Sequence, residues 1–177
     1  MSEPLHYQSL MSVAQQLRSK ELSARALTEH MLTRIYRLDN ELLSYATVTP
    51  ELARAQARRA EEEIQAGRYR GFLHGVPVAI KDLCCTAGIR TMGGLKVRQQ
   101  FVPEFNATVV RKLEDAGAVL LGKLNLTEGA LSAYNPEFPI PKNPWGKELW
   151  AGVSSSGSGV AVAAGLCFAA IGTDTGG

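Results

Sequence analysis

Histidine and cysteine are scarce in this sequence, and their positions argue against several kinds of site. Only three of each occur among 177 residues. His6, His30 and His74 lie too far apart to suggest a metal-binding motif, so no metal is expected. The cysteines form no C-x-x-C pair, and Cys84 directly precedes Cys85, which does not favour a disulfide framework. This usage fits a reducing cytoplasm, with the two adjacent thiols as small packing residues.

Long apolar runs and blocks of basic residues are also missing. The longest apolar stretch, Val160 to Ile171, is too short to span a bilayer, so no membrane association is expected. The first ten residues, MSEPLHYQSL, have neither the basic start nor the apolar core of a secretory signal. The net charge is only +2, and basic residues are interspersed with acidic ones. Nucleic acid is therefore not expected as a direct ligand.

The rest of the composition is that of a folded chain. Hydrophobic residues make up 45% and charged residues 20%, which is typical of globular proteins. Residues 1–70 are expected to form an N-terminal helical layer. Ser9 and Ser23 can cap two helices, and Pro50 suits the first turn of a third helix that ends near Gly67.

Strand and helix patterns alternate in residues 71–177. Val76–Ile80 and Ala118–Leu121 read as short buried strands, and a helix with Thr108 as its cap lies between them. The alanine-rich segment Val160–Leu166 predicts a tightly packed helix. This alternation indicates an α/β fold.

A serine-rich turn, GVSSSGS at 152–158, directly precedes the alanine-rich helix. It does not match three familiar motifs. No Gly-Lys-Ser/Thr follows for a phosphate loop, and Val162 stands where a dinucleotide fingerprint needs its third glycine. Ser156 stands where the hydrolase motif G-x-S-x-G needs its last glycine. Ser154 can also be interpreted as the cap of the following helix, and this role is compatible with a catalytic one.

Three sequence motifs, in the same order along the chain as in a known family, carry a resemblance to that family. They are GVPVAIKD at 75–82, GVSSSGS at 152–158 and GTDTGG at 172–177. Shorter matches lie at 106–110, 117–125 and 143–145. From Gly75 to the last residue the chain resembles the amidase signature family, whose site is a Ser–Ser–Lys arrangement. Val153 and Ser156 replace common glycines, which favours a stand-alone amidase.

The resemblance implies a fold and a reaction. The fold is a mixed β-sheet between helical layers, and residues 71–177 are the N-terminal part of that α/β domain. The reaction is hydrolysis of a carboxamide to an acid and ammonia or an amine through a serine acyl-enzyme, without metal or organic cofactor. The expected partners are a small-molecule amide and a second copy in a homodimer. Two alternatives stay open: the glutaminase (A-type) subunit of a tRNA-dependent amidotransferase, and a truncated, non-enzymatic binding domain.

The resemblance also assigns the two central residues. Lys81 is implied as the base, and Ser154 as a bridging serine held by a cis peptide bond with a neighbour. A lysine accepts a proton only when neutral, so Lys81 is expected to be buried with a lowered pKa. The nucleophilic serine of the family comes directly after the pair that ends in Gly177, so the 177-residue chain by itself is expected to be inactive.

The remaining site residues carry supporting roles by the same resemblance. The backbone amides of the last three residues are implied to form the oxyanion hole, because glycines permit the close approach that such a turn needs. These are Thr175, Gly176 and Gly177. Hydrogen bonds that brace the loops are implied for Ser155, Thr173 and Asp174.

Overall fold

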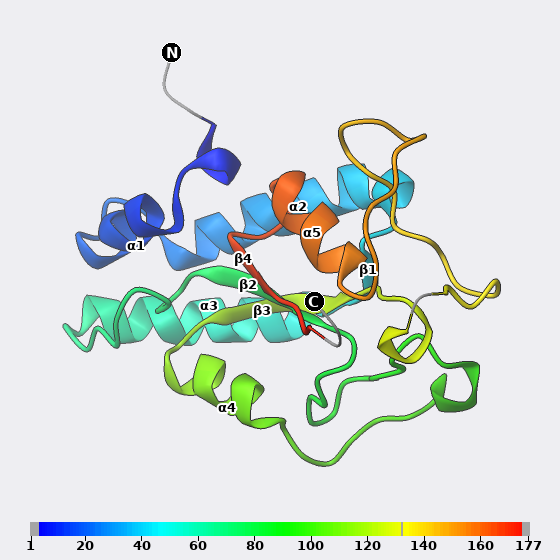
Figure 1. The fold of residues 1–177 in the computed structure, drawn as a ribbon. Helices are drawn as coiled ribbons and strands as arrows, with labels where there is room; N and C mark the ends of the chain where they lie inside the picture. Colours follow the sequence, from blue (N-terminus) through cyan, green and yellow to red (C-terminus); the bar gives the residue numbers. More distant parts are fainter. Residues whose placement is uncertain (1–3, 132, 175–177) are drawn as a thin grey trace.

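A computed structural model describes residues 4–131 and 133–174 as a sheet with helices on both faces (Figure 1). The strands are β1 (Tyr45–Val48), β2 (Pro77–Lys81), β3 (Val119–Leu124) and β4 (Ala169–Ile171). The α-helices are α1 (Leu10–Arg18), α2 (Ala24–Leu42), α3 (Pro50–Gln65), α4 (Thr108–Asp115) and α5 (Ser156–Ala163). Single 3-10 turns lie at Leu5–Tyr7, Lys96–Arg98 and Glu128–Ala130.

The sheet is mixed, with the strand order β1-β3-β2-β4. β2 runs parallel to both β3 and β4, whereas β1 pairs antiparallel with β3. The predicted α/β fold with a mixed sheet between helices is confirmed. β1 was not predicted, and it lies inside residues 1–70, where only helices were expected. β4 was not predicted either, since its three residues continue an apolar run without a break.

The N-terminal helices begin as expected. The hydroxyl groups of Ser9 and Ser23 accept hydrogen bonds from the backbone of the first turns of α1 and α2, at 3.1 Å in each case. Pro50 occupies the first turn of α3. Thr108, in contrast, is not a cap: it is the first residue of α4, and Ala107 precedes it without a side-chain cap.

Helix α5 starts at Ser156, four residues before the predicted start at Val160. The helix can begin this early because Gly157 has no side chain. An added Cβ at Gly157 would lie 2.5 Å from the backbone oxygen of Asn125 and 2.6 Å from that of Ser44. Glycine lets the first turn of α5 lie directly against the end of β3. The serine–glycine stretch is therefore the start of the helix rather than a turn ahead of it.

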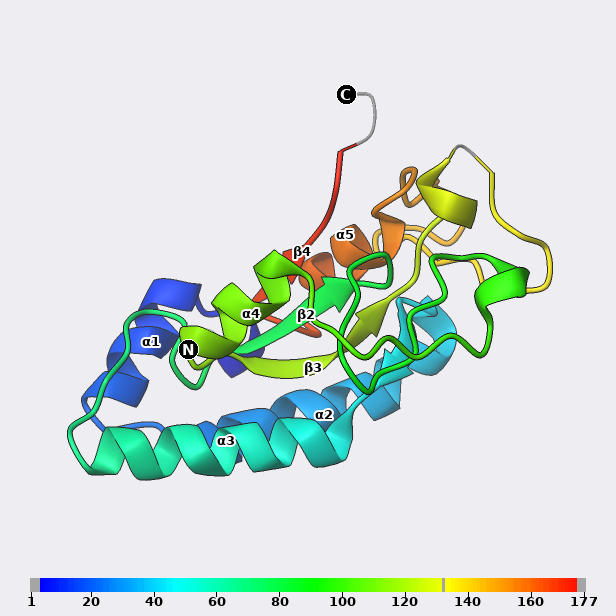
Figure 2. The same cartoon turned by 90° about the horizontal axis from the view of Figure 1, so that it is seen from below.

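The two faces of the sheet are covered differently. One face packs against α2, α3 and α5, through residues such as Ala79 and Leu121. Ile80 and Leu120, which alternate with them, pack with Val110 of α4. Figure 2 shows α2 and α3 side by side below the sheet and α4 on its other side. Consecutive residues at the end of β2 therefore meet different surroundings.

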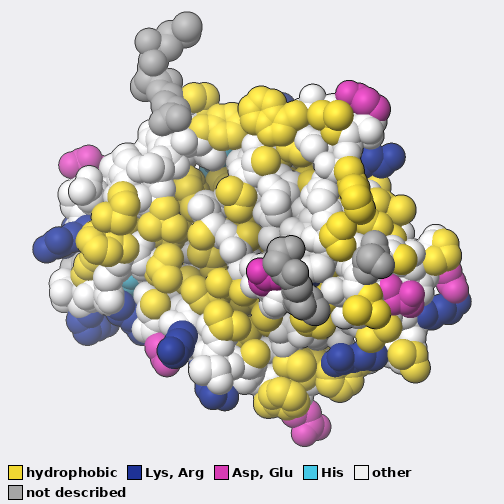
Figure 3. Space-filling model, in the orientation of Figure 1, with side chains coloured by type: hydrophobic (Ala, Val, Ile, Leu, Met, Phe, Trp, Pro, Cys, Tyr) yellow, Lys and Arg dark blue, Asp and Glu magenta, His cyan; other side chains and the backbone are white. Residues whose placement is uncertain are grey.

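Apolar side chains gather over the middle of the face seen in Figure 3, and lysine and arginine lie mainly around its edge. Several large apolar side chains are exposed, among them Trp145 at 83% and Trp150 at 68%. Within residues 4–131 and 133–174, no helix is both long and apolar enough to cross a membrane.

A buried histidine joins α3 to the segment that leads into β2. His74 is fully buried, its Nδ1 accepts from the backbone N–H of Arg70 at 3.1 Å, and its Nε2 lies 3.0 Å from Glu63 Oε2. Gly117 has a φ of +77°, and a Cβ added there would lie 2.3 Å from His74 Cδ2. Glycine is thus needed at this position both for its backbone conformation and for space.

We expect Gly117→Ala to lower the free energy of unfolding by about 2–4 kcal/mol, because a strained backbone and an overpacked core add together. Gly67→Ala is the matched control, since its φ is +78° and no atom lies within 4 Å of an added Cβ. That variant should lose only the backbone contribution of about 1 kcal/mol. Urea denaturation of both variants measures the difference, and equal losses would contradict the steric argument.

Candidate active site

The predicted site residues meet at one edge of the sheet. Lys81 is the last residue of β2, and Thr173 follows β4 by two residues. Because β2 and β4 are parallel neighbours, their carboxyl ends lie at the same edge. Ser154 and Ser155 come just before α5, which packs against both strands. The edge therefore collects residues from three separate parts of the chain.

The side chain of Lys81 is fully buried and ends among three hydroxyl groups. Its Nζ donates to Ser154 Oγ at 2.8 Å, to Ser155 Oγ at 3.0 Å and to Thr173 Oγ1 at 2.6 Å. The predicted burial of Lys81 and its contact with Ser154 are thus both present. We call these four residues the lysine–hydroxyl cluster.

The surroundings of this amine favour its neutral form. Burial lowers the pKa of Lys81 from its ordinary value of 10.5, and the nearby Cys84 opposes part of that effect. The three hydrogen-bond partners are neutral hydroxyls, which stabilise an ammonium less than a carboxylate does. Hydroxyls can also donate to a neutral amine, so the cluster stays hydrogen-bonded after the proton leaves.

Further hydrogen bonds join the loops that hold the cluster. Ser155 Oγ donates to the backbone oxygen of Thr173 and accepts from its backbone N–H, both at 3.1 Å. Ser158 Oγ donates to the backbone oxygen of Ile171 at 3.0 Å. These contacts tie the first turns of α5 to the end of β4.

The expected cis peptide bond at Ser154 is absent, since no peptide bond is cis in the part of the chain that the structure describes. Ser154 instead has a φ of 44°, and the backbone N–H of Ser155 donates to the oxygen of Val153 at 2.6 Å. A trans bond is lower in energy by about 3 kcal/mol, and the left-handed residue turns the chain in its place. The helix-cap role is not seen, because Ser155 is the N-cap residue of α5 and makes no side-chain cap bond.

The family was identified by comparison with known proteins. A model of the amidase family matches residues 26–177. The chain belongs to the amidase family. It is 53% identical over 168 residues to the protein named "Putative amidase AmiD" of Mycobacterium bovis, and the match covers 95% of this chain and 35% of that protein.

Two other relatives of this amidase-family chain are informative. The A-type subunit of the glutamyl-tRNA(Gln) amidotransferase of Pseudomonas aeruginosa is 47% identical over 175 residues, which are 98% of this chain and 36% of that protein. The peptide amidase PAM, solved in complex with the competitive inhibitor chymostatin, matches with a TM-score of 0.89 and 36% identity over 95% of this chain and 36% of that one. The chain thus spans little more than a third of the length of these amidase-family proteins.

Some predicted residues are not placed by the structure. Thr175, Gly176 and Gly177, the predicted oxyanion hole, lie outside the described residues. Asp174 is exposed. The oxyanion and bracing roles of these residues stay predictions.

Other residues that shape this amidase-family site were not singled out from the sequence. The side-chain amide of Asn125 donates to the backbone oxygens of Leu43 at 2.8 Å and Tyr45 at 3.3 Å. Its backbone oxygen accepts from the N–H of Gly157 at 3.1 Å. Asn125 therefore fixes the start of α5 relative to β1 and β3. Its position just after a buried strand was the available clue.

The neighbouring thiols play a smaller part. All three cysteines are free; Cys84 and Cys85 are half-buried, and Cys167 is buried. Burial raises the pKa of the Cys84 thiol. A protonated thiol is a poor nucleophile, so this environment does not favour a thiolate reaction.

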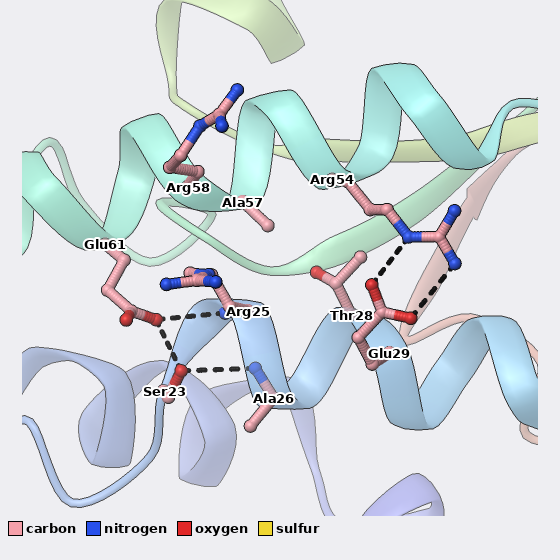
Figure 4. A pocket seen from close by; sticks show the side chains of 9 residues that line it. All are labelled: Ser23, Arg25, Ala26, Thr28, Glu29, Arg54, Ala57, Arg58 and Glu61. Atoms are coloured by element: carbon pink, nitrogen blue, oxygen red, sulfur yellow. Dashed lines mark hydrogen bonds and ion pairs between the residues drawn. The ribbon is translucent and has the colours of Figure 1, made fainter.

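A pocket of about 460 Å³ lies apart from the lysine–hydroxyl cluster, between α2 and α3 (Figure 4). Both of its carboxylates are hydrogen-bonded. Arg54 binds the Glu29 carboxylate through two hydrogen bonds of 2.7 and 3.1 Å. Glu61 accepts from the Ser23 hydroxyl and, at 3.1 Å, from the backbone N–H of Arg25. The residues that line this pocket connect α2 to α3, and none of them belongs to the lysine–hydroxyl cluster.

The lowered pKa of Lys81 predicts how stability depends on pH. In the unfolded chain the amine keeps its proton up to about 10.5, but in the folded chain it releases it at lower pH. Unfolding takes up a proton between these two values, so raising the pH stabilises the folded state there. Relative to Lys81→Met, the wild-type protein should gain up to about 1.4 kcal/mol per pH unit in this window.

Denaturation curves of both proteins at several pH values between 7 and 10 measure this gain. Lys123, whose pKa burial also lowers, is present in both proteins, so its contribution cancels. The quantity of interest is the unfolding free energy of the wild type minus that of Lys81→Met. If this quantity stays constant or falls as the pH rises, a lowered pKa at Lys81 is contradicted.

Proposed function

We propose that this amidase-family protein hydrolyses a carboxamide to a carboxylic acid and ammonia or an amine, through a serine acyl-enzyme. Lys81 is the proposed base, and Ser154 the serine that passes the proton to it. The observation that carries the proposal is the 2.8 Å contact between Lys81 Nζ and Ser154 Oγ in a fully buried position. A base and its proton donor must lie within about 2.6–3.2 Å, as these atoms do.

The proposed reaction begins with a neutral Lys81. Its amine takes the proton of the Ser154 hydroxyl, which takes the proton of the nucleophilic serine that by resemblance follows Gly177. The serine oxygen attacks the amide carbon, and the carbonyl oxygen becomes the oxyanion. Collapse of this intermediate breaks the C–N bond, and the proton returns from Lys81 through Ser154 to the leaving nitrogen. Water then attacks the acyl-enzyme and releases the acid.

The supporting residues have distinct proposed tasks. Thr173 and Ser155 hold the amine in place through bonds of 2.6 and 3.0 Å, so that it faces Ser154. The backbone amides of Thr175, Gly176 and Gly177 are proposed to bind the oxyanion. Asp174 is proposed to brace the turn between these two groups. No metal or organic cofactor takes part in any step of this scheme.

The proposed substrate is a small-molecule amide, and the protein at full natural length is the form to test. The matched relatives are nearly three times as long as the part this chain covers. Because the proposed nucleophile follows Gly177, the 177 residues alone are proposed to be inactive, and a homodimer is the proposed assembly of the whole protein.

The second candidate function is the glutaminase subunit of a tRNA-dependent amidotransferase. The 47% identity to the A-type subunit of the Pseudomonas aeruginosa enzyme favours it. Such a subunit needs partner proteins, whereas a stand-alone amidase does not. Affinity purification of the tagged full-length protein from its own cells separates the two: partners in fixed stoichiometry and activity only in their presence support the amidotransferase, and full activity of the pure protein supports the stand-alone amidase.

In the full-length protein, Lys81→Ala should lower kcat by about 10²–10⁴-fold, the usual contribution of a general base. Ser154→Ala should cost somewhat less, because water can partly replace a hydroxyl in a proton relay. Steady-state kinetics with glutamine and a panel of small aliphatic and aromatic amides measures both. Lys147→Ala is the control, since Lys147 is exposed and pairs with the exposed Glu41.

The pH profile gives a second readout. Wild-type kcat/KM should rise with pH as the base loses its proton, with a midpoint below the 10.5 of an ordinary lysine. A Lys81→Ala enzyme within about threefold of wild type would rule out Lys81 as the base and the proposed mechanism with it.

A further inference from the structure

A second lysine is buried at the same edge of the sheet. Lys123 of β3 is fully buried, and its Nζ donates to the backbone oxygen of Cys84 at 2.9 Å and to Thr91 Oγ1 at 2.7 Å. Asp82 Oδ1 lies 3.4 Å from the same nitrogen, which is an ion pair rather than a short hydrogen bond. Lys123 therefore connects β3 to the loop that follows β2.

The carboxylate in this pair belongs to the residue next to the proposed base. Asp82 is only 1% exposed. Its Oδ2 accepts from the backbone N–H of Met92 at 2.9 Å, and its backbone oxygen accepts from that of Gly93 at 3.0 Å. Its own N–H donates to the backbone oxygen of Leu124 at 2.9 Å. Each polar group of Asp82 is thus directed to β3 or to the loop at 91–93.

The two buried lysines have different partners. Lys81 reaches the serines ahead of α5 and Thr173, whereas Asp82 and Lys123 reach the loop after β2. Lys123 lies opposite Ile80 in the register of β2 and β3, and neighbouring residues of a strand point to opposite faces, which accounts for the separation of the two lysines. Among the residues that the structure describes, Lys81 is bound by three hydroxyls, and Lys123 by a carboxylate, a hydroxyl and a carbonyl.

This division matters for a lysine that acts as a base. A buried carboxylate within several ångströms of an amine favours the ammonium form strongly, because charges interact over longer distances in a protein interior than in water. An ammonium cannot accept a proton. An unpaired Asp82, adjacent to Lys81 in the chain, would therefore work against the proposed base.

We infer that Lys123 is a positioning residue for amide hydrolysis, which binds the Asp82 carboxylate and the 84–91 loop and so compensates that negative charge next to the Lys81 position in the chain. This inference rests on the proposed function of Lys81. It assigns a task to a buried ion pair that a packing role alone does not require, since apolar residues fill such positions at no greater cost.

Other titratable groups face the same atoms. Cys84 acts on Lys81 and on Lys123, and Cys85 acts on Lys123. Burial raises the pKa of Cys84, so this thiol stays neutral around pH 7. Lys123 lowers the pKa of Cys84, so Lys123→Met raises that pKa further and keeps the thiol neutral. A neutral thiol does not stabilise an ammonium, so Cys84 cannot cause the upward shift of the Lys81 pKa that the inference predicts.

The test is the pH dependence of kcat/KM in the full-length protein. In Lys123→Met, Asp82 loses its cation. Burial raises the pKa of this carboxyl and the Met92 N–H opposes part of that effect, so the test reads the ascending limb, at alkaline pH, where the carboxyl is ionised. The ascending limb is the pH range over which kcat/KM rises as Lys81 loses its proton. This limb should move to higher pH by about one unit, so that kcat/KM at a given pH on the limb falls about tenfold. In the double variant Asp82→Asn/Lys123→Met no lone charge is left, and the limb should return to within about 0.3 units of wild type.

Lys147→Met is the matched control, because it removes an exposed lysine paired with Glu41 and should leave the limb in place. An unmoved limb in folded Lys123→Met, or a double variant that stays displaced or inactive, would overturn the inference. If Lys123→Met does not fold, Lys123→Gln takes its place, because its amide removes the charge but can still donate to the Cys84 carbonyl and the Thr91 hydroxyl, and the same shift of the limb is expected.

The same experiment keeps this inference apart from the proposed function. Lys81→Ala is measured beside the other variants. If it retains activity, the proposed function of Lys81 fails. If Lys81→Ala is inactive but the ascending limb of Lys123→Met stays at the pH of the wild type, the role of Lys123 fails and that of Lys81 stands.

Discussion

Burial of the Lys81 amine is the constraint on which the rest of the candidate site depends. Removing an amine from water is costly unless it is hydrogen-bonded, and the cost is greatest for the charged form. Three hydroxyl groups at 2.6–3.0 Å meet this requirement without a negative charge. The amine is therefore held in place without being locked in its protonated form. That combination suits a base and does not suit a structural salt bridge.

The fold creates this environment by bringing three chain segments to one edge of the sheet. β2 ends in Lys81, β4 leads into Thr173, and α5 begins just after the serines. The parallel pairing of β2 with β4 sets the first two in place. Close contact between Gly157 and the end of β3 sets the third. A side chain at Gly157 would move α5 and with it the hydroxyls around the amine.

Sequence patterns with a local physical cause could be predicted. Hydroxyl caps at Ser9 and Ser23 and a proline in the first turn of α3 each depend on residues within one turn, and all are present. The strand that ends in Lys81 followed from its β-branched run. The pairing of Lys81 with Ser154 came instead from resemblance to a family, because no local rule joins residues 73 positions apart.

The features that sequence did not predict depend on contacts between distant segments. β1 and β4 have four and three residues, too few for a periodic pattern, and they form because β3 and β2 offer edges to pair with. The early start of α5 depends on the backbone of Asn125. The partners of Lys123 could not be predicted for the same reason, although its position after the apolar run 118–121 was an available clue to its burial.

The most direct test of this account is a titration of the Lys81 side chain itself. Lysine-labelled protein at full natural length, followed by NMR at the carbon beside Nζ, gives one curve per lysine, and Lys81→Met assigns the curve of interest. The account predicts a midpoint for Lys81 below its ordinary value of 10.5. A midpoint at or above 10.5 would mean that the site stabilises the ammonium, and Lys81 could not be the base.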